Sequence, residues 1–458
     1  MSEVEEWLLA HQDQALQTLI EFCRIPSVST DPAYVSGLAR AAEFVAQHLT
    51  QAGFPDVEVV ETGGAPCVFA EWCDARGAPT VLVYGHYDVQ PPDPVVKWHS
   101  PPFAPEIRDG KVYARGASDD KGPLLIPILV AAAFKAVQGR LPLNLKILVE
   151  GEEETGSPHF DVTVARLRDR LVCDLVVSAD GAMWRADLPS VIVACRGLVA
   201  LEVTVEGAAK DLHSGRHGGT APNPIRVLTQ ILATLHDAQG CVQVAEFSQG
   251  ALPQDPLIEI AIRDVSFDSA GYFADIGAAE PVPLPSGEDL LIRQWLCPTL
   301  EFNGISGGYH GPGIKTVIPS QASVKITCRL VAGQMPDAVT AAIARHLRAV
   351  VPAGFRLLVV QQGPGTPAVA LDPALPALRT AECILTDLMG RAPVRIAMGA
   401  TVPFAEVFAR RLGIGTIFFS FATSDEDYHA PNEHFRLSNF RIGQIAWARL
   451  FEHLARSE

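Results

Sequence analysis

Between residues 81 and 179, short apolar segments alternate with polar turns and with one long apolar segment. The short segments are VLVY (81–84), LKILVE (145–150) and LVVSA (175–179), and GPLLIPILVAAAFKAV lies between the first two. Strands that are apolar along their whole length are typical of parallel sheets that helices cover on both faces. The sequence therefore predicts an α/β fold with a mixed, mostly parallel sheet.

Side chains that bind metals follow each of these strands. They are His86 and Asp88 after the first, Glu152, Glu153 and Glu154 after the second, Asp180 after the third, Asp119 and Asp120 before the long apolar segment, and His429 in a later loop. In open α/β sheets, ligands bind at the carboxyl ends of the strands. Two histidines and several carboxylates gathered there would form a mixed nitrogen and oxygen site for one or two divalent cations. A further carboxylate beside a ligand can act as a general base, so the pattern predicts a metal-dependent hydrolase.

Each motif also has a purely structural interpretation when it is taken alone. His86 and Asp88 could lie in a surface turn, although in an extended chain they point the same way, so that Asp88 could orient the imidazole. Asp119 or Asp120 could cap the next helix. The three consecutive glutamates could form a solvated face, but their repulsion costs free energy unless cations offset it. The functional interpretation rests on the co-occurrence of these motifs.

Composition restricts the partners and the compartment. The 36 basic and 52 acidic side chains give a formal net charge of −16, which argues against nucleic acid and against anionic membrane surfaces. The nine cysteines are odd in number and form no CxxC pair, so we expect neither a disulfide framework nor a structural zinc knot. The segment MSEVEEWLLAHQDQ is acidic and lacks a long apolar run. We expect a cytoplasmic protein. The net charge says little about the substrate, because a local site can be cationic in an acidic protein.

The pattern changes near residue 195. LVALEVTVEG alternates apolar and polar residues like a half-exposed antiparallel strand, and NPIRVLTQILATLHD, SVKITCRLV, PDAVTAAIARHLRAVV and FRLLVVQQ follow as alternating helical and strand-like segments. This β-α-β-β-α-β order is typical of a ferredoxin-like sandwich. Residues 240–300 fit neither pattern, and we interpret them as an elaboration of that domain. We predict a catalytic domain formed by residues 1–194 and 369–458, with an inserted domain at 195–368.

Six motifs together identify a family. They are GHYDVQP, RGASDDKGP, EGEEETGS, KDLHSGRHGG, GIKTVIP and YHAPNE, in this order. With them the chain resembles the M20 metallopeptidases over nearly its whole length, above all the cytosolic non-specific dipeptidases of the carnosinase type. The resemblance implies a zinc-peptidase-like catalytic domain, an inserted dimerisation or lid domain, a homodimer, and two divalent metal ions. Zinc and manganese fit these ligands, and cobalt is also possible.

The activity implied by the resemblance is hydrolysis of a dipeptide that has a free C-terminal carboxylate. Two alternatives remain: an N-acyl amino acid deacylase with the same site, and a non-catalytic relative that has lost its metals. Many carnosinase-type sequences have Glu-Gly-Gly-Ser where this chain has Met398-Gly399-Ala400-Thr401. This departure leaves the substrate preference open, but it does not affect the metal chemistry.

The resemblance also implies roles for the metal ligands. Asp119 would bridge the two metals, with His86 and Asp180 completing one position and Glu154 and His429 completing the other. The peptide between Asp119 and Asp120 would be cis.

Other roles concern catalysis and the substrate. Glu153 would be the general base, and Asp88 a catalytic residue beside the first histidine ligand. His213 would reach into the partner subunit's site, contact the substrate and stabilise the oxyanion. Thr316, Arg329 and Thr401 would bind the substrate's carboxylate end or help to polarise its carbonyl.

Overall fold

The computed structural model describes residues 1–253, 256–265, 267–281 and 283–456. The chain divides into unit 1 (residues 1–193, 371–396 and 403–458) and unit 2 (194–370 and 397–402). The predicted domain boundaries lie beside the crossings at 193/194 and 370/371. Segment 397–402, which the sequence pattern assigned to the catalytic domain, instead belongs to unit 2. There, Arg196 donates a hydrogen bond to the Gly399 carbonyl, and Arg329 donates one to the Thr401 hydroxyl.

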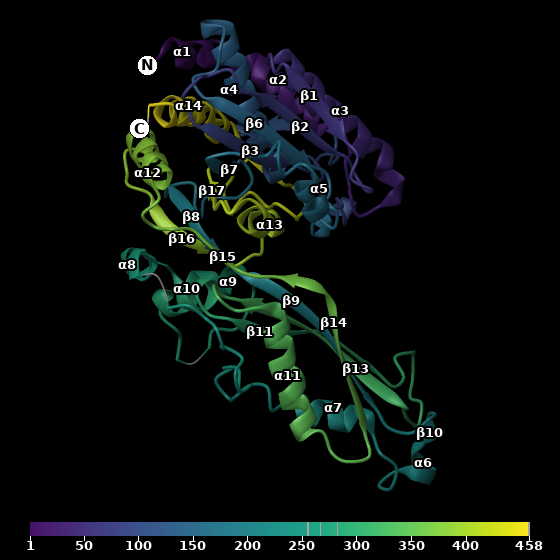
Figure 1. Ribbon diagram of the computed structural model, residues 1–458. Coiled ribbons are helices and arrows are strands. Elements are labelled where there is room, and N and C mark those ends of the chain that lie inside the picture. Colours follow the sequence, from purple (N-terminus) through teal and green to yellow (C-terminus); the bar gives the residue numbers. More distant parts are fainter. Residues whose placement is uncertain (254–255, 266, 282, 457–458) are drawn as a thin grey trace. The chain divides into compact units, whose positions relative to one another are not determined.

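Unit 1 is built on a six-stranded sheet in the order β1-β2-β6-β3-β7-β17 (Figure 1). Its strands are β1 (Asp56–Val60), β2 (Cys67–Trp72), β3 (Thr80–His86), β6 (Asn144–Glu150), β7 (Leu175–Ser178) and β17 (Thr416–Phe418). Strands β6, β3, β7 and β17 run parallel to one another, and β1 and β2 add an antiparallel edge. The predicted mixed, mostly parallel sheet is therefore confirmed.

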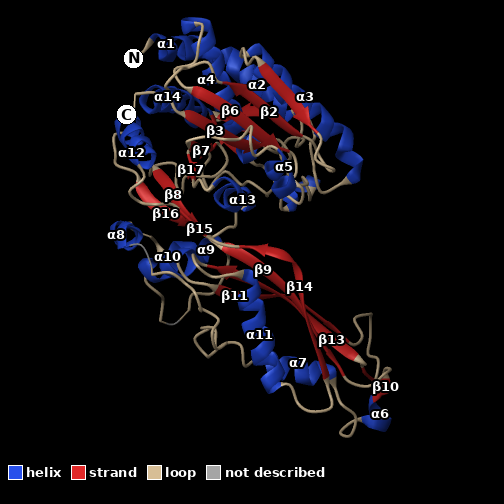
Figure 2. Ribbon diagram, viewed as in Figure 1, coloured by secondary structure: helices blue, strands red, loops and turns tan. Residues whose placement is uncertain are grey.

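Helices cover both faces of this sheet (Figure 2). On β3, the Tyr84 ring stacks on Phe404 of α13 (Pro403–Leu412) and packs edge-on against Phe160 of α5 (Phe160–Arg166). The next residue along the strand, Gly85, faces Leu124 of α4 (Gly122–Gln138) on the opposite side. Because adjacent residues of a strand point to opposite faces, α4 and the α5–α13 pair enclose the centre of the sheet.

The remaining elements of unit 1 surround this centre. They are α1 (Glu3–Ala10), α2 (Gln12–Cys23), α3 (Val35–Gln51), α12 (Pro376–Met389) and α14 (Leu437–Leu454), with a small sheet of β4 (Glu106–Arg108), β5 (Lys111–Tyr113) and β18 (His434–Arg436). Helix α14 buries Trp447 and Phe451 completely, so its apolar face forms part of the core.

Unit 2 contains a four-stranded antiparallel sheet in the order β11-β13-β9-β14. Its strands are β9 (Gly197–Glu206), β11 (Thr299–Gly307), β13 (Gln321–Leu330) and β14 (Arg356–Thr366), and its helices are α7 (Pro224–Leu232) and α11 (Pro336–Val350). Along the chain the elements run β9, α7, β11, β13, α11, β14. This is the β-α-β-β-α-β order of a ferredoxin-like sandwich, as predicted.

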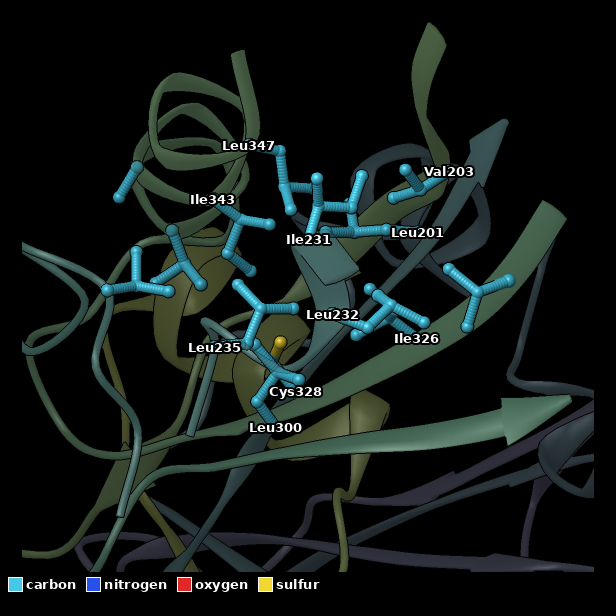
Figure 3. Close-up of a cluster of buried hydrophobic side chains, with 14 of the residues drawn as sticks. Leu201, Val203, Ile231, Leu232, Leu235, Leu300, Ile326, Cys328, Ile343 and Leu347 are labelled. Carbon is cyan, nitrogen blue, oxygen red and sulfur yellow. The ribbon is translucent and has the colours of Figure 1, made fainter. Parts of the chain in front are cut away.

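One face of the unit 2 sheet and its two helices enclose an apolar core (Figure 3). Leu201 and Val203 of β9 and Ile326 and Cys328 of β13 face Ile231, Leu232, Ile343 and Leu347 from α7 and α11. The alternation of buried and half-buried residues along β9 explains why its sequence alternates apolar and polar residues. The elaboration at 240–300 contains α8 (Pro256–Asp264), α9 (Ser269–Asp275) and α10 (Gly287–Trp295).

Short elements complete the description. Strand β10 (Leu212–His213) pairs with β12 (Val317–Ile318), and α6 (Ser214–His217) follows β10. Strands β8 (Ser190–Cys195), β15 (Val369–Ala370) and β16 (Val394–Met398) form a three-stranded sheet in the order β15-β8-β16. All nine cysteines are free thiols. Within the described ranges, every helix is too short or too polar to cross a membrane.

Candidate metal centre

Three parallel strands of the unit 1 sheet have candidate ligands at or just after their carboxyl ends. His86 is the last residue of β3, Asp180 follows the end of β7, and Glu154 follows β6. Asp119 lies in the loop before α4. Gly85 permits the approach of that loop, because a side chain there would meet Asp120 Oδ2 and Leu124 Cδ1 at 2.8 Å. The carboxyl ends of the strands are thus the location of the candidate ligands, as in other open α/β sheets.

Two groups of ligand atoms share Asp119. One consists of His86, Asp119 and Asp180, and the other of Asp119, Glu154 and His429. His86 Nε2 lies 3.0 Å from Asp119 Oδ1, and His429 Nε2 lies 3.0 Å from Asp119 Oδ2. His429 Nε2 also lies 3.1 Å from Glu154 Oε2. All five predicted ligands therefore come together, and each oxygen of one carboxylate faces a different imidazole.

The electrostatics of these groups reflect an excess of carboxylates in a buried place. Burial raises the pKa of Glu154 to about 7 and that of Asp180 to about 6, and the Asp119 charge contributes to both shifts. Hydrogen bonds with Asp119 and Glu154 raise the pKa of His429 to about 10. Carboxylates in such a place remain ionised only when positive charge compensates them. In this cluster the histidines supply that charge, and divalent cations would supply more.

The donor set fits divalent cations. His86 Nδ1 donates to the Asp88 main-chain oxygen at 3.1 Å, which leaves Nε2 of the same ring directed at Asp119. A ring whose other nitrogen is held by an oxygen acceptor is the usual arrangement of a metal-binding histidine. Together with three carboxylates, two imidazole nitrogens suit borderline or hard cations such as Zn²⁺ or Mn²⁺.

Asp88 contacts more than the histidine that we expected it to orient. Its carboxylate lies 3.3 Å from His86 Nδ1, and it also accepts the main-chain N–H groups of Glu153 at 3.2 Å and Glu154 at 3.1 Å. Asp88 is completely buried. One side chain thus fixes the backbone of both glutamates relative to β3, a connection that the His-x-Asp spacing alone did not indicate.

Glu153 is adjacent to a ligand but belongs to neither ligand group. Burial raises its pKa well above the usual range, and the charges of Asp180 and Glu154 add to this effect. A buried carboxylate with a raised pKa takes up a proton readily, as a general base requires. Its position beside the ligands agrees with the predicted role, which stays a prediction.

In unit 2 the four predicted substrate residues form two pairs. Thr316 Oγ1 lies 3.5 Å from His213 Nε2, next to the β10–β12 pairing. Arg329 donates to Thr401 Oγ1 at 2.8 Å. The two pairs lie toward opposite ends of β13, because the chain passes from β12 into Gln321 and Arg329 lies near the other end. At about 3.3 Å per residue, Gln321 and Arg329 are about 26 Å apart.

Sequence reasoning missed a group of buried charges around the metal ligands. Arg115, Glu426 and Glu433 are 1%, 0% and 0% exposed, and Arg115 Nη1 donates to Glu433 Oε2 at 2.7 Å. Arg115 belongs to the RGASDDKGP motif and Glu433 to the YHAPNE motif, so a signal was present. A pairing over such a sequence separation is visible only in the folded chain. The peptide between Asp119 and Asp120 is cis, as the resemblance implied.

Comparisons with known proteins agree with this geometry. Residues 82–453 match the model of peptidase family M20/M25/M40. The chain is 30% identical to the Beta-Ala-His dipeptidase of Mus musculus, over 97% of this chain and 94% of that protein. It is 28% identical to the Cys-Gly metallodipeptidase DUG1 of Saccharomyces cerevisiae, over 97% of this chain and 96% of that protein.

Solved structures show the same fold. Human carnosine dipeptidase 1 superposes with a TM-score of 0.83 at 28% identity, covering 99% of this chain and 98% of that one. The M20 family metallo-carboxypeptidase Sso-CP2 from Sulfolobus solfataricus superposes with a TM-score of 0.86 at 26% identity, covering 99% of this chain and 100% of that one. The family match, the full-length relatives and the five ligands lead to one conclusion: this chain belongs to peptidase family M20/M25/M40 and is a metallopeptidase.

Proposed function

We propose that this protein hydrolyses dipeptides that carry a free C-terminal carboxylate, with divalent cations at two positions that share Asp119. The observation that carries the proposal is the placement of the two Asp119 oxygens, each 3.0 Å from the Nε2 atom of a different histidine. Relatives that match nearly the whole chain bear the names of dipeptidases. A carboxylate whose two oxygens face different nitrogen ligands can hold two neighbouring cations.

The donors restrict the choice of cations. Two imidazole nitrogens and three carboxylates suit Zn²⁺ or Mn²⁺, and Co²⁺ is also compatible with them. When bound, two such cations would lower the pKa of a shared water molecule and polarise the scissile carbonyl. The protein's contribution is to hold the five ligands at fixed positions on strand ends and loops.

Glu153 is the residue that we assign to proton transfer. It would accept a proton from the attacking water and pass it to the leaving amine. Asp88 would hold the Glu153 backbone while it also holds the His86 ring, because its carboxylate contacts both residues. General acid–base catalysis by one positioned side chain contributes about 10²–10⁴-fold to rates of this kind.

Arg329 is the residue that we assign to the substrate's carboxylate. It is half-buried, and it donates a hydrogen bond to the neutral hydroxyl of Thr401. Arg196 lies close enough that burial and the Arg329 charge together lower its pKa to about 10. Although the protein has a net charge of −16, these two neighbouring guanidinium groups provide a local positive field for a carboxylate. Thr316 and Thr401 would add hydroxyl groups for the substrate.

The separation of the two pairs in unit 2 supports a homodimer. His213 lies beside β12, which precedes Gln321 at one end of β13, and Arg329 lies near the other end, about 26 Å from Gln321 along the strand. One dipeptide is too short to contact both residues of the same chain. If His213 stabilises the oxyanion, it would do so in the site of a second copy, which requires a two-fold assembly.

Mixing two inactive variants tests this assembly. After verified subunit exchange, His213→Ala and Glu153→Gln should together recover activity. Random exchange places about half of the protein in heterodimers, each with one intact and one doubly altered site, so the expected activity is about a quarter of that of the wild type. No recovery would show that His213 acts within its own chain or does not take part.

The compartment is also part of the proposal. Nine free thiols, several of them buried, suit a reducing environment. We propose the cytoplasm, and fractionation of cells that express the full-length protein provides the test.

A substrate panel tests the central assignment. The metal-loaded protein would be assayed on dipeptides, on the same dipeptides with amidated C-termini, and on N-acetyl and N-succinyl amino acids. We expect hydrolysis of free dipeptides and little hydrolysis of the other two classes, because the amide removes the carboxylate that Arg329 would bind. A preference for N-acyl amino acids would instead establish a deacylase.

A further inference from the structure

The loop that carries His429 is attached to the rest of unit 1 by two buried glutamates. Glu426 precedes His429 by three residues, Glu433 follows it by four, and both side chains are completely buried. His429 itself has a half-exposed side chain and a backbone φ of 64°. The His429 ring is therefore held in place mainly by the contacts of its loop rather than by its own burial.

Glu433 binds the loop that carries Asp119. Its Oε1 accepts the main-chain N–H groups of Ser118 at 3.0 Å and Asp119 at 3.1 Å. Its Oε2 accepts the N–H of Gly116 at 2.8 Å and Nη1 of Arg115 at 2.7 Å. One carboxylate thus closes the loop from residue 115 to residue 119, including the backbone of the shared ligand.

Glu426, which precedes His429 in the sequence, binds the same loop. Its Oε2 accepts the Ser118 hydroxyl at 2.7 Å and the N–H of Thr423 at 3.1 Å. Its Oε1 accepts the main-chain N–H and Nη1 of Arg436, both at 3.1 Å. Ser118, the residue immediately before Asp119, is therefore held by both glutamates.

The other metal position takes two of its three ligands from the sheet and shares only Asp119 with the loops that the glutamates hold. His86 ends β3 and Asp180 follows β7, and these two strands are directly paired in parallel. Their separation is set by the hydrogen bonds of the sheet. The position formed by Asp119, Glu154 and His429 instead needs two loops, far apart in sequence, to remain in register with each other.

We propose that Glu433 and Glu426 are positioning residues that hold the His429 loop against the Asp119 loop, and that they selectively maintain the metal position of Asp119, Glu154 and His429. This inference rests on the proposed two-metal centre. Carboxylates are required because their oxygens accept several N–H groups at once. A glutamine amide would turn one acceptor atom into a donor facing Arg115 or the backbone N–H groups. Loss of outer contacts of this kind typically lowers metal affinity by about 10–100-fold.

Metal retention of the Glu433→Gln variant tests the proposal. The zinc-loaded full-length protein would be equilibrated with zinc buffers of decreasing free metal, and the zinc remaining per chain would be measured. We expect the wild type to hold two zinc ions. In the variant, one ion should be lost at a free zinc concentration at least about tenfold higher, while retention of the second changes little.

A matched control separates this effect from general destabilisation. Glu5 is also a buried carboxylate in unit 1, and it accepts a hydrogen bond from Arg449 at 2.7 Å. Glu5→Gln weakens this single contact between α1 and α14, and it should leave unchanged the free zinc concentration at which each ion is half lost. If Glu433→Gln does not fold, Ser118→Ala removes the bond to Glu426 alone, and it should weaken the same ion by a smaller factor.

The same substitution in the His429→Ala variant identifies which ion is affected. His429→Ala should retain only the ion at His86, Asp119 and Asp180. Adding Glu433→Gln to this variant should leave that ion's midpoint nearly unchanged. Equal weakening of the binding of both ions by Glu433→Gln, or no weakening, would contradict the positioning role of Glu433 and leave the two-metal centre intact. A wild-type protein that holds fewer than two zinc ions would overturn the proposed centre itself.

Discussion

The two metal positions of this protein are constructed differently, although they share Asp119. At one position, His86 is completely buried at the end of β3, and Asp180 follows the neighbouring parallel strand. At the other, His429 is half-exposed on a loop, and its partner Glu154 follows β6. At the first position, backbone pairing within a sheet sets two of the three ligands, and the third is the shared Asp119. The second is set by side chains, namely the contacts of Asp88 with the Glu154 backbone and of two buried glutamates with the Asp119 loop.

One metal centre thus combines ligands on strand ends with a ligand on a loop. Sheet hydrogen bonds fix strand ends to within small displacements, whereas a loop keeps its place only through the contacts of a few residues. We therefore expect the strand-end position to tolerate changes in the surrounding side chains, and the loop position to respond to them. Substitutions at the two positions test that contrast.

The largest effect is expected from removing the ligand that the two positions share. Asp119→Ala deletes a ligand from both, so both ions should be lost and dipeptide hydrolysis should fall to the level of the metal-free protein. Elemental analysis and an activity assay measure this directly. If one ion remained with unchanged affinity, the two positions would not share the carboxylate.

Glu153→Gln should separate catalysis from metal binding. The variant keeps all five ligands, so we expect two ions per chain and a decrease in kcat of about 10²–10⁴-fold. The change should appear in kcat rather than in KM, because Glu153 is assigned no part in binding the carboxylate. Full metal content with activity within tenfold of the wild type would contradict the assignment of the base.

The two histidine ligands should differ in their effect on stability. In the metal-free protein, His86→Ala removes a fully buried ring that contacts both Asp88 and Asp119, and we expect a loss of about 3 kcal/mol in the free energy of unfolding. His429→Ala removes a half-exposed ring from two largely buried carboxylates, and we expect a smaller loss than for His86→Ala because solvent screens the exposed ring. Denaturant titration of both variants measures the difference. Equal losses would contradict the contrast between the buried and the exposed position.

The smallest expected effect is the pH dependence of metal binding. In the metal-free protein the pKa of His429 is raised to about 10 by Asp119 and Glu154, so the ring is protonated at pH 7. A cation that binds there must displace this proton, and metal affinity should fall as the pH decreases from 8 to 6. Calorimetry in two buffers of different ionisation enthalpy counts the protons released. His429→Ala should release fewer protons than the wild type, and unchanged release would show that His429 is already neutral.

The positions of His86 and Asp180 could be predicted from the sequence, because both residues follow strands that run in the same direction. The apolar strands of a parallel sheet end at one common edge, so His86 and Asp180 were expected to meet there. His429 was included only because several metal-type motifs occur together, and its pairing with Glu154 followed from the resemblance to a family. A loop histidine has no periodic pattern around it.

The supporting contacts could not be predicted in the same way. A glutamate in a polar loop, such as Glu433, is usually solvated, and only the folded chain shows that Arg115 and three backbone N–H groups surround it. Segment 397–402 is a similar case, because its membership of unit 2 depends on the hydrogen bonds of Arg196 and Arg329. Local patterns predict elements, whereas long-range polar contacts depend on the complete fold.

Anomalous diffraction from crystals of the zinc-loaded protein tests the central claim most directly. The account predicts two zinc peaks in each chain, about 3.5–4 Å apart, with one Asp119 oxygen coordinating each ion. His86 and Asp180 should complete one coordination sphere, and Glu154 and His429 the other. A single fully occupied peak, or two peaks without Asp119 between them, would contradict the account.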